Sequence, residues 1–159
     1  MDKILAILEH NAKATPAQVA SMLGQSEEDV KKAIEEYEKE GIILGYKAII
    51  NWEKTQRENV TALIEVKVTP QYGMGFDSIA QEICKHTEVE SIYLMSGGFD
   101  FTVIIAGRTM KEVARFVAEK LAPMKTVLST GTHFVLKKYK EQGVEFSPDL
   151  RDERGVISW

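Results

Sequence analysis

The first fifty residues carry hydrophobic side chains at the spacing of α-helices. Three amphipathic stretches are predicted, and their apolar positions are Ile4, Leu5, Ile7 and Leu8, then Val19, Ala20 and Leu23, then Val30, Ala33, Ile34 and Tyr37. Thr15 and Gln18 form a capping-box pattern at the start of the second stretch, and Ser26 is the expected N-cap of the third. Gly24 is the expected stop of the second helix. Helices joined by so tight a turn predict a helix-turn-helix.

The segment 41–50, GIILGYKAII, follows the third helix. Its β-branched content and the break at Gly45 predict a short hairpin, which would make residues 1–50 a winged helix-turn-helix. A plain three-helix bundle remains an alternative, because the same caps would suit it.

Residues 51–59 are polar and lack periodicity, so we interpret them as a linker. Beyond them, strand-like and helix-like patterns alternate. Strands are expected over 60–68, 89–94, 101–106 and 127–137, and helices over 76–84 and 109–121. The order βαββαβ predicts a ferredoxin-like domain over 60–140, and hence an α+β protein. Helices on one sheet face would leave the other bare, so we expect that face to be buried against a second copy.

The C-terminal tail, 141–159, contains a run of mixed charges, which is most simply a solvated segment. Its last residues, GVISW, offer a weaker alternative, a strand added to the edge of a neighbouring sheet.

Composition narrows the class of protein. Of the 159 residues, 44% are hydrophobic and 28% are charged, as in ordinary soluble domains. No apolar run approaches the ~18 residues that span a bilayer, and Met1 leads directly into a helical pattern, so we expect a cytoplasmic protein with no membrane partner. The single cysteine, Cys84, has the apolar spacing of its helix and is expected in the core. A net charge of −4 argues against binding nucleic acid by bulk charge alone.

No group of residues points to catalysis. His10, His86 and His133 lie in separate segments without metal-ligand spacing, so neither a metal nor a cofactor is expected. The chain has no Gly-x-Ser-x-Gly elbow, Walker lysine or metalloprotease helix. We therefore expect no enzyme, although a small ferredoxin-like enzyme remains a third hypothesis.

The expected recognition helix is unusually acidic. Residues 1–52 hold six lysines and no arginine against nine acidic residues. Glu28 and Lys32, and likewise Glu35 and Lys39, have the i, i+4 spacing of helical ion pairs, which indicates a solvated face that pairs with itself. A DNA contact would depend on the two adjacent lysines for phosphates and on the preceding turn for base edges. The candidate DNA-contacting residues are Thr15, Gln25, Ser26, Glu28, Lys31 and Lys32.

The stretch MSGGFDF, residues 95–101, lies between two expected strands. Its glycines would let an amino or carboxylate group approach the backbone, and Asp100 can accept a hydrogen bond from an ammonium. The competing interpretation is a hairpin turn at Gly97-Gly98 in which Asp100 binds amides of its own loop. SGGFD lacks a lysine and leads into a strand, whereas phosphate loops lead into a helix.

Together the two halves resemble the Lrp/AsnC family of feast/famine transcription regulators, from about Asp2 to Lys140. The N-terminal resemblance rests on DKILAIL, TPAQVASMLGQSEEDVKKAIEEYEKEGII and LGYKAIIN. In the C-terminal half, SGGFDF matches the family's Gly-x-aromatic-Asp signature, and STGTHFVL matches its Thr-x-Thr strand opening. The sequence departs from the family at Lys31, Lys32 and Ala33, where arginines commonly follow the cap.

The resemblance implies a ligand-responsive regulator that binds double-stranded DNA and senses an amino acid or related metabolite. It also implies a homodimer that assembles further to a tetramer or octamer, with the glycine-rich hairpin at a contact between dimers. The implied effector-binding residues are Ser96, Gly97, Gly98, Phe99, Asp100, Thr130 and Thr132. The competing hypothesis is a metabolite-binding module whose helix-turn-helix serves mainly as an oligomer scaffold, with weak or lost DNA binding.

Overall fold

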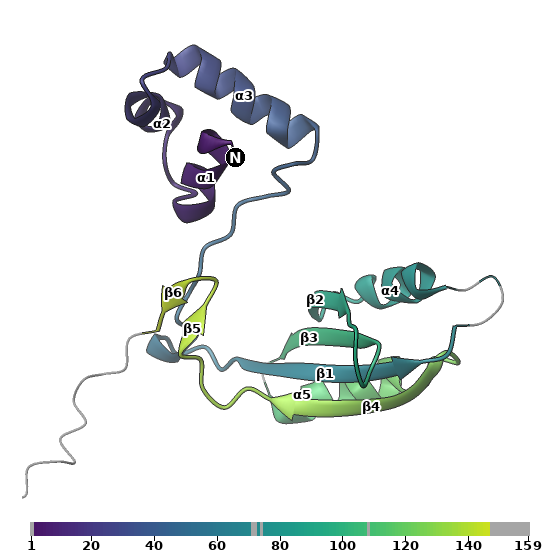
Figure 1. The fold of residues 1–159 in the computed structure, drawn as a ribbon. Helices are drawn as coiled ribbons and strands as arrows, with labels where there is room; N and C mark the ends of the chain where they lie inside the picture. The colour runs from purple at the N-terminus through teal and green to yellow at the C-terminus, as the bar shows by residue number, and fades with distance from the viewer. Residues whose placement is uncertain (1, 71–72, 74, 108, 147–159) are drawn as a thin grey trace, which may run out of the picture. The chain divides into compact units, whose positions relative to one another are not determined.

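The computed structural model describes residues 2–70, 73, 75–107 and 109–146. The chain forms two compact units, Met1–Ile49 and Ile50–Trp159 (Figure 1). The strand considered for GVISW lies outside the described residues.

The N-terminal unit contains three helices, α1 (Lys3–His10), α2 (Pro16–Leu23) and α3 (Glu27–Lys39). The capping box at Thr15 is confirmed, because its hydroxyl accepts from the Gln18 amide while the Gln18 side chain accepts from the Thr15 amide. Gly24 ends α2 in the left-handed conformation, with φ at 66°. The buried side chains of this unit come from all three helices and the turn after α1, and they are Ile4, Leu8, Ala14, Val19, Ala20 and Val30.

The hairpin expected over 41–50 is not formed. No strand is assigned to these residues, and the chain leaves α3 through a turn at Gly41, where φ is 71°. Ile42, Leu44 and Tyr46 are exposed along this segment. Their β-branched and aromatic character suits a strand, but nothing within the described chain supplies a partner strand for it.

A hydrogen bond between side chains joins the start of α1 to the last part of α3. The carboxylate of Asp2 caps α1 by accepting from the amides of Ile4 and Leu5, and it also accepts a short hydrogen bond from the Tyr37 hydroxyl near the end of α3. The Tyr37 hydrogen bond is the main cause that lowers the pKa of Asp2 below its usual value, against a smaller opposing effect of burial. The same bond raises the pKa of Tyr37.

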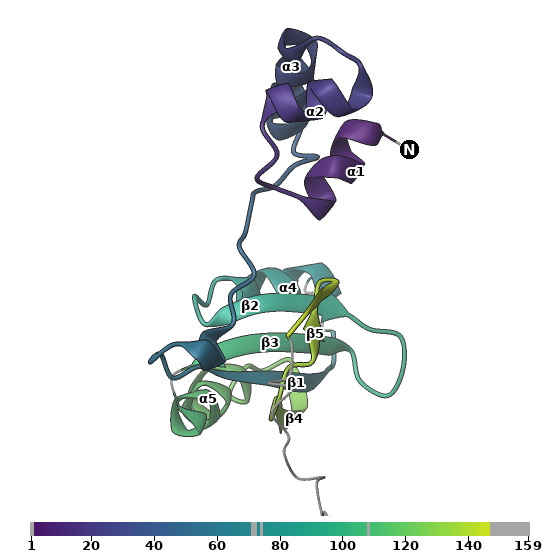
Figure 2. The same cartoon turned by 90° about the vertical axis from the view of Figure 1, so that its left-hand side faces the viewer.

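The second unit contains a four-stranded antiparallel sheet. Along the chain, β1 (Val60–Val68), α4 (Phe76–Cys84), β2 (Val89–Leu94), β3 (Phe101–Gly107), α5 (Met110–Phe116) and β4 (Val127–Phe134) follow one another, and a turn of π-helix, Val117–Leu121, extends α5. The strands lie in the order β2-β3-β1-β4 (Figure 2). This is the expected ferredoxin-like arrangement.

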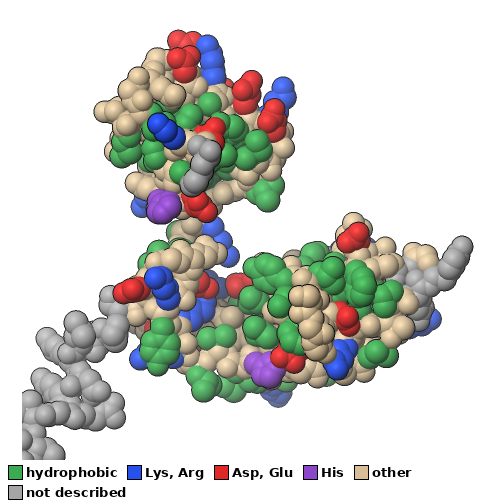
Figure 3. All heavy atoms as spheres, viewed as in Figure 1, with side chains coloured by type: hydrophobic (Ala, Val, Ile, Leu, Met, Phe, Trp, Pro, Cys, Tyr) green, Lys and Arg blue, Asp and Glu red, His purple; other side chains and the backbone are tan. Residues whose placement is uncertain are grey.

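The two faces of the sheet differ in character. Ala62, Ile64 and Val66 of β1 are fully buried and pack with α4 and α5 in a single core. Because side chains alternate along a strand, Leu63 and Glu65 lie on the opposite, helix-free face. The cross-strand register places further residues on that face, namely Tyr93, Thr102, Ile104, Gly131 and His133. Figure 3 shows hydrophobic side chains over this unit with acidic, basic and histidine side chains among them.

Three details differ from the expectations. Cys84 is exposed at the end of α4, so its assignment to the core is wrong. Strand β4 ends at Phe134, three residues before the expected Lys137, because its pairing with β1 runs out where β1 begins. A small hairpin, β5 (Lys140–Glu141) and β6 (Val144–Glu145), follows and was not expected.

The Asp2 contact generates a testable prediction. Asp2→Ala should destabilise the N-terminal unit by about 0.5–2 kcal/mol, the usual effect of losing an N-cap. Since the folded pKa of Asp2 is lowered, its stabilisation is complete above the unfolded pKa and disappears as pH falls through the folded value. Thermal unfolding followed by circular dichroism at neutral pH and near pH 3 measures both effects.

The control for this prediction is Tyr37→Phe, which keeps the ring and removes only the hydroxyl. It should retain the cap but reduce the acid sensitivity that Asp2 contributes. Equal unfolding of the Asp2→Ala variant and the unmodified chain at neutral pH would contradict the prediction.

Candidate DNA-binding and effector sites

The candidate DNA-contacting residues lie at the start of α2, in the turn that follows α2, and on α3. Thr15 is occupied by the capping box at the start of α2. Ser26 caps α3, where its hydroxyl accepts from the Asp29 amide at 3.1 Å and donates to the Asp29 carboxylate at 2.6 Å. Gln25 is exposed beside it. The segment between α2 and α3 is therefore exposed, and the first turn of α3, which follows it, is acidic.

Both candidate phosphate-binding lysines lie beside glutamates on α3. The Nζ atom of Lys32 is 2.9 Å from the Glu28 carboxylate, which confirms that expected pair. Glu35 lies 4.0 Å from Lys31, and the expected Glu35–Lys39 pair is not formed among the described residues. Acidic and basic side chains alternate along the outer surface of α3 in Figure 3. Such exposed pairs are weak, so DNA phosphates can compete for these lysines.

The glycine-rich hairpin 95–100 is hydrogen-bonded to the end of β1. The Oδ2 atom of Asp100 accepts a hydrogen bond from the Val68 amide at 2.8 Å, and the Asp100 amide donates to the Val66 carbonyl at 3.0 Å. The Met95 amide donates to the Asp100 carbonyl at 2.8 Å and closes the loop. The carboxylate thus binds a neighbouring strand and not the amides of its own loop, a role that the sequence pattern did not indicate.

Two candidate effector threonines lie across β1 from this hairpin. Thr130 pairs with Val66 and Thr132 pairs with Ile64, while the hairpin leads into Phe101, which pairs with Val66 from the other side. The structure therefore brings the hairpin and Thr130 to the same end of the sheet, with β1 between them. Ser96, Gly97, Gly98 and Thr132 are exposed, whereas Phe99 and Thr130 are half-buried.

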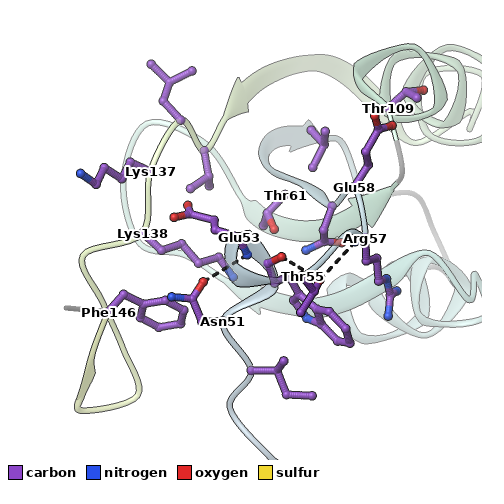
Figure 4. Close-up of a pocket in the computed structure, with 16 residues that line it drawn as sticks. Asn51, Glu53, Thr55, Arg57, Glu58, Thr61, Thr109, Lys137, Lys138 and Phe146 are labelled. Carbon is purple, nitrogen blue, oxygen red and sulfur yellow. Dashed lines mark hydrogen bonds between the residues drawn. The ribbon is translucent and has the colours of Figure 1, made fainter. Parts of the chain in front are cut away.

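Two hollows of this unit lie elsewhere. One of about 510 Å³ is lined by the linker, the start of β1 and the chain beyond β4 (Figure 4). Another of about 270 Å³ lies between β3 and α5. Neither includes residues 96–100, Thr130 or Thr132. The sequence pattern predicted a linker over 51–59 and did not indicate the first hollow, although Trp52 and Arg57 within a polar stretch are a signal that could have done so.

The linker has local structure of its own. It contains a short 3-10 helix, Trp52–Lys54, which Asn51 caps by accepting from the Glu53 amide. In the part of the chain that the structure describes, no helix is long and apolar enough to cross a membrane.

A helix-turn-helix unit joined to a ferredoxin-like sheet defines a two-domain DNA-binding regulator that responds to a ligand. Comparison with known proteins supports this class. Residues 3–43 match the family model for winged helix-turn-helix DNA-binding domains, and residues 61–145 match the Lrp/AsnC ligand binding domain. The chain belongs to the Lrp/AsnC family of transcription regulators.

Individual relatives agree with this assignment. The chain is 48% identical over 157 residues to the HTH-type transcriptional regulator YugG of Bacillus subtilis, covering 98% of this chain and 95% of that protein. It is 25% identical to a proline dehydrogenase transcriptional activator of Rhizobium radiobacter, covering 89% and 90% of the two chains. A solved transcriptional regulator of Neisseria meningitidis, in complex with L-methionine, has the same fold with a TM-score of 0.71 and 23% identity, covering 94% of each chain.

The hydrogen bond from the Val68 amide to Asp100 predicts an effect on thermal stability that is measurable without any ligand. Asp100→Ala should lower the melting temperature, because the buried Val68 amide would have no acceptor, at a cost of about 1–3 kcal/mol. Asp100→Asn keeps an oxygen acceptor and should have a smaller effect. If the alanine variant melts at the temperature of the unmodified chain, Asp100 has no structural role and serves only a ligand.

Proposed function

We propose that this regulator is a cytoplasmic, homo-oligomeric protein without enzymatic activity, whose effector is an amino acid or related metabolite. The observation that supports an amino-acid effector is the position of Asp100. One oxygen of its carboxylate binds the Val68 amide, and no described residue binds the other. That second oxygen remains available to an ammonium group. The Neisseria regulator, similar in fold, holds L-methionine, which supports the same class of ligand.

The proposed effector site comprises the exposed hairpin and the neighbouring end of β4. Ser96, Gly97 and Gly98 leave the backbone open to a ligand, Phe99 supplies an apolar wall, and Thr130 and Thr132 supply hydroxyls. Neither of the two hollows described above includes these residues. A second copy that packs against the hairpin would complete the enclosure, which is why oligomerisation belongs to the proposal.

The helix-free face supports a dimer. Tyr93 is 53% exposed there, and the half-buried Leu63 and Ile104 pair with each other on the same face, where Glu65 and His133 lie 3.4 Å apart. A face that exposes aromatic and aliphatic side chains together with polar groups is typical of a protein interface. We propose that two copies join through this face, as the starting unit of a tetramer or octamer.

DNA binding is tested by titrating the protein against DNA from its own upstream region and against random DNA at several salt concentrations. We expect tighter binding to the upstream DNA. In a Lys31→Ala, Lys32→Ala double variant, the slope of log affinity against log salt should fall by about one unit for each phosphate that is no longer bound. Equal affinity for both DNAs at low salt would contradict the regulatory proposal.

Two variants on α3 serve as controls for this titration. Lys39→Ala removes a lysine from the last turn of α3, away from the candidate turn, and should leave the slope unchanged. Glu28→Gln releases Lys32 from its 2.9 Å ion pair and should strengthen binding to both DNAs. A slope unaffected by the double variant would mean that the two lysines only pair with their glutamates.

If two copies join through the helix-free face, a charged substitution on that face should lower the mass of the assembly. Ile104→Glu should convert the assembly to a smaller species in light scattering at micromolar concentration, because a charge would be buried at the interface. Met110→Glu is the matched control, since Met110 is 54% exposed on α5 and lies away from that face. A monomeric unmodified chain would contradict the dimer.

A further inference from the structure

The 510 Å³ hollow lies at the opposite end of β1 from the glycine-rich hairpin. Val60 and Thr61, at the start of β1, line it, whereas the hairpin contacts Val66 and Val68 near the other end. The linker forms one wall, and residues 135–138 with Phe146 form another (Figure 4). Its volume lies within the range of ordinary small-molecule sites, ~300–1,000 Å³.

The linker wall is held in place by its own side chains. The Thr55 hydroxyl donates to the Trp52 carbonyl at 2.8 Å and accepts from the Arg57 amide at 3.2 Å. The guanidinium of Arg57 lies over the Trp52 ring, 4.3 Å from its centroid. The stacking orients a planar group that can bind a carboxylate with two parallel hydrogen bonds.

Side chains of both signs line the hollow, and they are only partly paired. Lys138 is occupied by Glu141 at 2.9 Å, and Lys137 points away from the hollow in Figure 4. Among the described residues, Arg57 has no carboxylate partner, and neither Glu53 nor Glu58 has a cationic one. A free anion such as phosphate would meet two carboxylates, whereas a ligand with one positive and one negative group can match both signs.

Part of the remaining lining is apolar. Trp52, Val60, Val135 and Phe146 line the hollow and offer a surface for a hydrophobic side chain. Neutral polar side chains lie among them, namely Asn51, Thr55, Asn59, Thr61 and Thr109, of which Thr61 is buried. A small apolar body with a carboxylate and an ammonium fits this combination of groups.

We propose that this hollow is a second ligand site, which binds a small zwitterion of the amino-acid type. Arg57 binds the carboxylate, Glu58 or Glu53 binds the ammonium, and the side chain packs on Trp52 and Phe146. The site rests on the proposed amino-acid response but does not use the hairpin residues. A ligand here would join the linker to the chain beyond β4 and so restrict the segment that leads into the DNA-binding unit.

Trp52 makes the site directly observable. The chain has two tryptophans, so Trp159→Phe leaves Trp52 as the only tryptophan fluorophore. In this background, without DNA, L-leucine, L-methionine and L-phenylalanine are titrated while tryptophan fluorescence is recorded. At least one should give a saturable change. L-methioninamide, which lacks the carboxylate, N-acetyl-L-methionine, which lacks the ammonium, and inorganic phosphate should give none at the same concentrations.

Substitutions inside and outside the lining test whether the fluorescence change comes from this site. Arg57→Gln should weaken the apparent affinity about tenfold or more, the effect of removing a charged hydrogen-bond partner, and Glu58→Gln provides a second test on another side chain. Lys54→Gln removes a cation from the same linker outside the lining and should change nothing. Far-UV circular dichroism checks that each variant remains folded.

Three results would overturn the proposal. The first is no saturable change with any of the three amino acids. The second is a change abolished by Thr132→Val and unaffected by both Arg57→Gln and Glu58→Gln, since the signal would then originate at the hairpin. The third is equal binding of the amide or acetyl compound, which would exclude recognition of a zwitterion. Each is independent of DNA binding, so failure of this site and failure of the regulatory proposal are distinguishable.

Discussion

The two-residue alternation of β1 is the constraint on which the C-terminal unit depends. This strand pairs with β3 on one side and β4 on the other, so its register positions the residues of both neighbouring strands. Its inward residues, Ala62, Ile64 and Val66, are fully buried against both helices, and full burial of a large aliphatic side chain contributes roughly 1.5–3 kcal/mol. A shift of one residue would exchange the core face for the helix-free face.

The two ends of β1 carry the two proposed ligand sites. At its C-terminal end, the Asp100 carboxylate accepts from the Val68 amide just beyond the last β1–β3 pair, which holds the glycine-rich hairpin against β1. At its beginning, the folded linker and the segment after β4 line a hollow within one chain.

The charge distribution of α3 combines two opposing effects. Glu27, Glu28 and Asp29 in its first turn interact favourably with the helix dipole, and together with the Ser26 cap they stabilise the helix. The same carboxylates repel phosphates near a turn that must approach DNA. The phosphate contacts proposed for α3 are therefore limited to Lys31 and Lys32, and the salt dependence that α3 contributes should be small, about one unit of slope for each lysine.

The sequence by itself determined the parts that depend on neighbours a few residues apart. Helical and strand periodicity predicted the three N-terminal helices, both helices of the sheet unit and its four strands, and the caps at Thr15 and Ser26 followed from local hydrogen bonding. Only the tertiary structure decided what depends on distant partners. Asp100 binds an amide 32 positions away, and the linker forms a hollow with a segment far along the chain. Cys84 has apolar spacing but lies at the exposed end of its helix, and 41–50 has strand-like residues without a partner strand in the described chain, because periodicity specifies a face and never what lies against it.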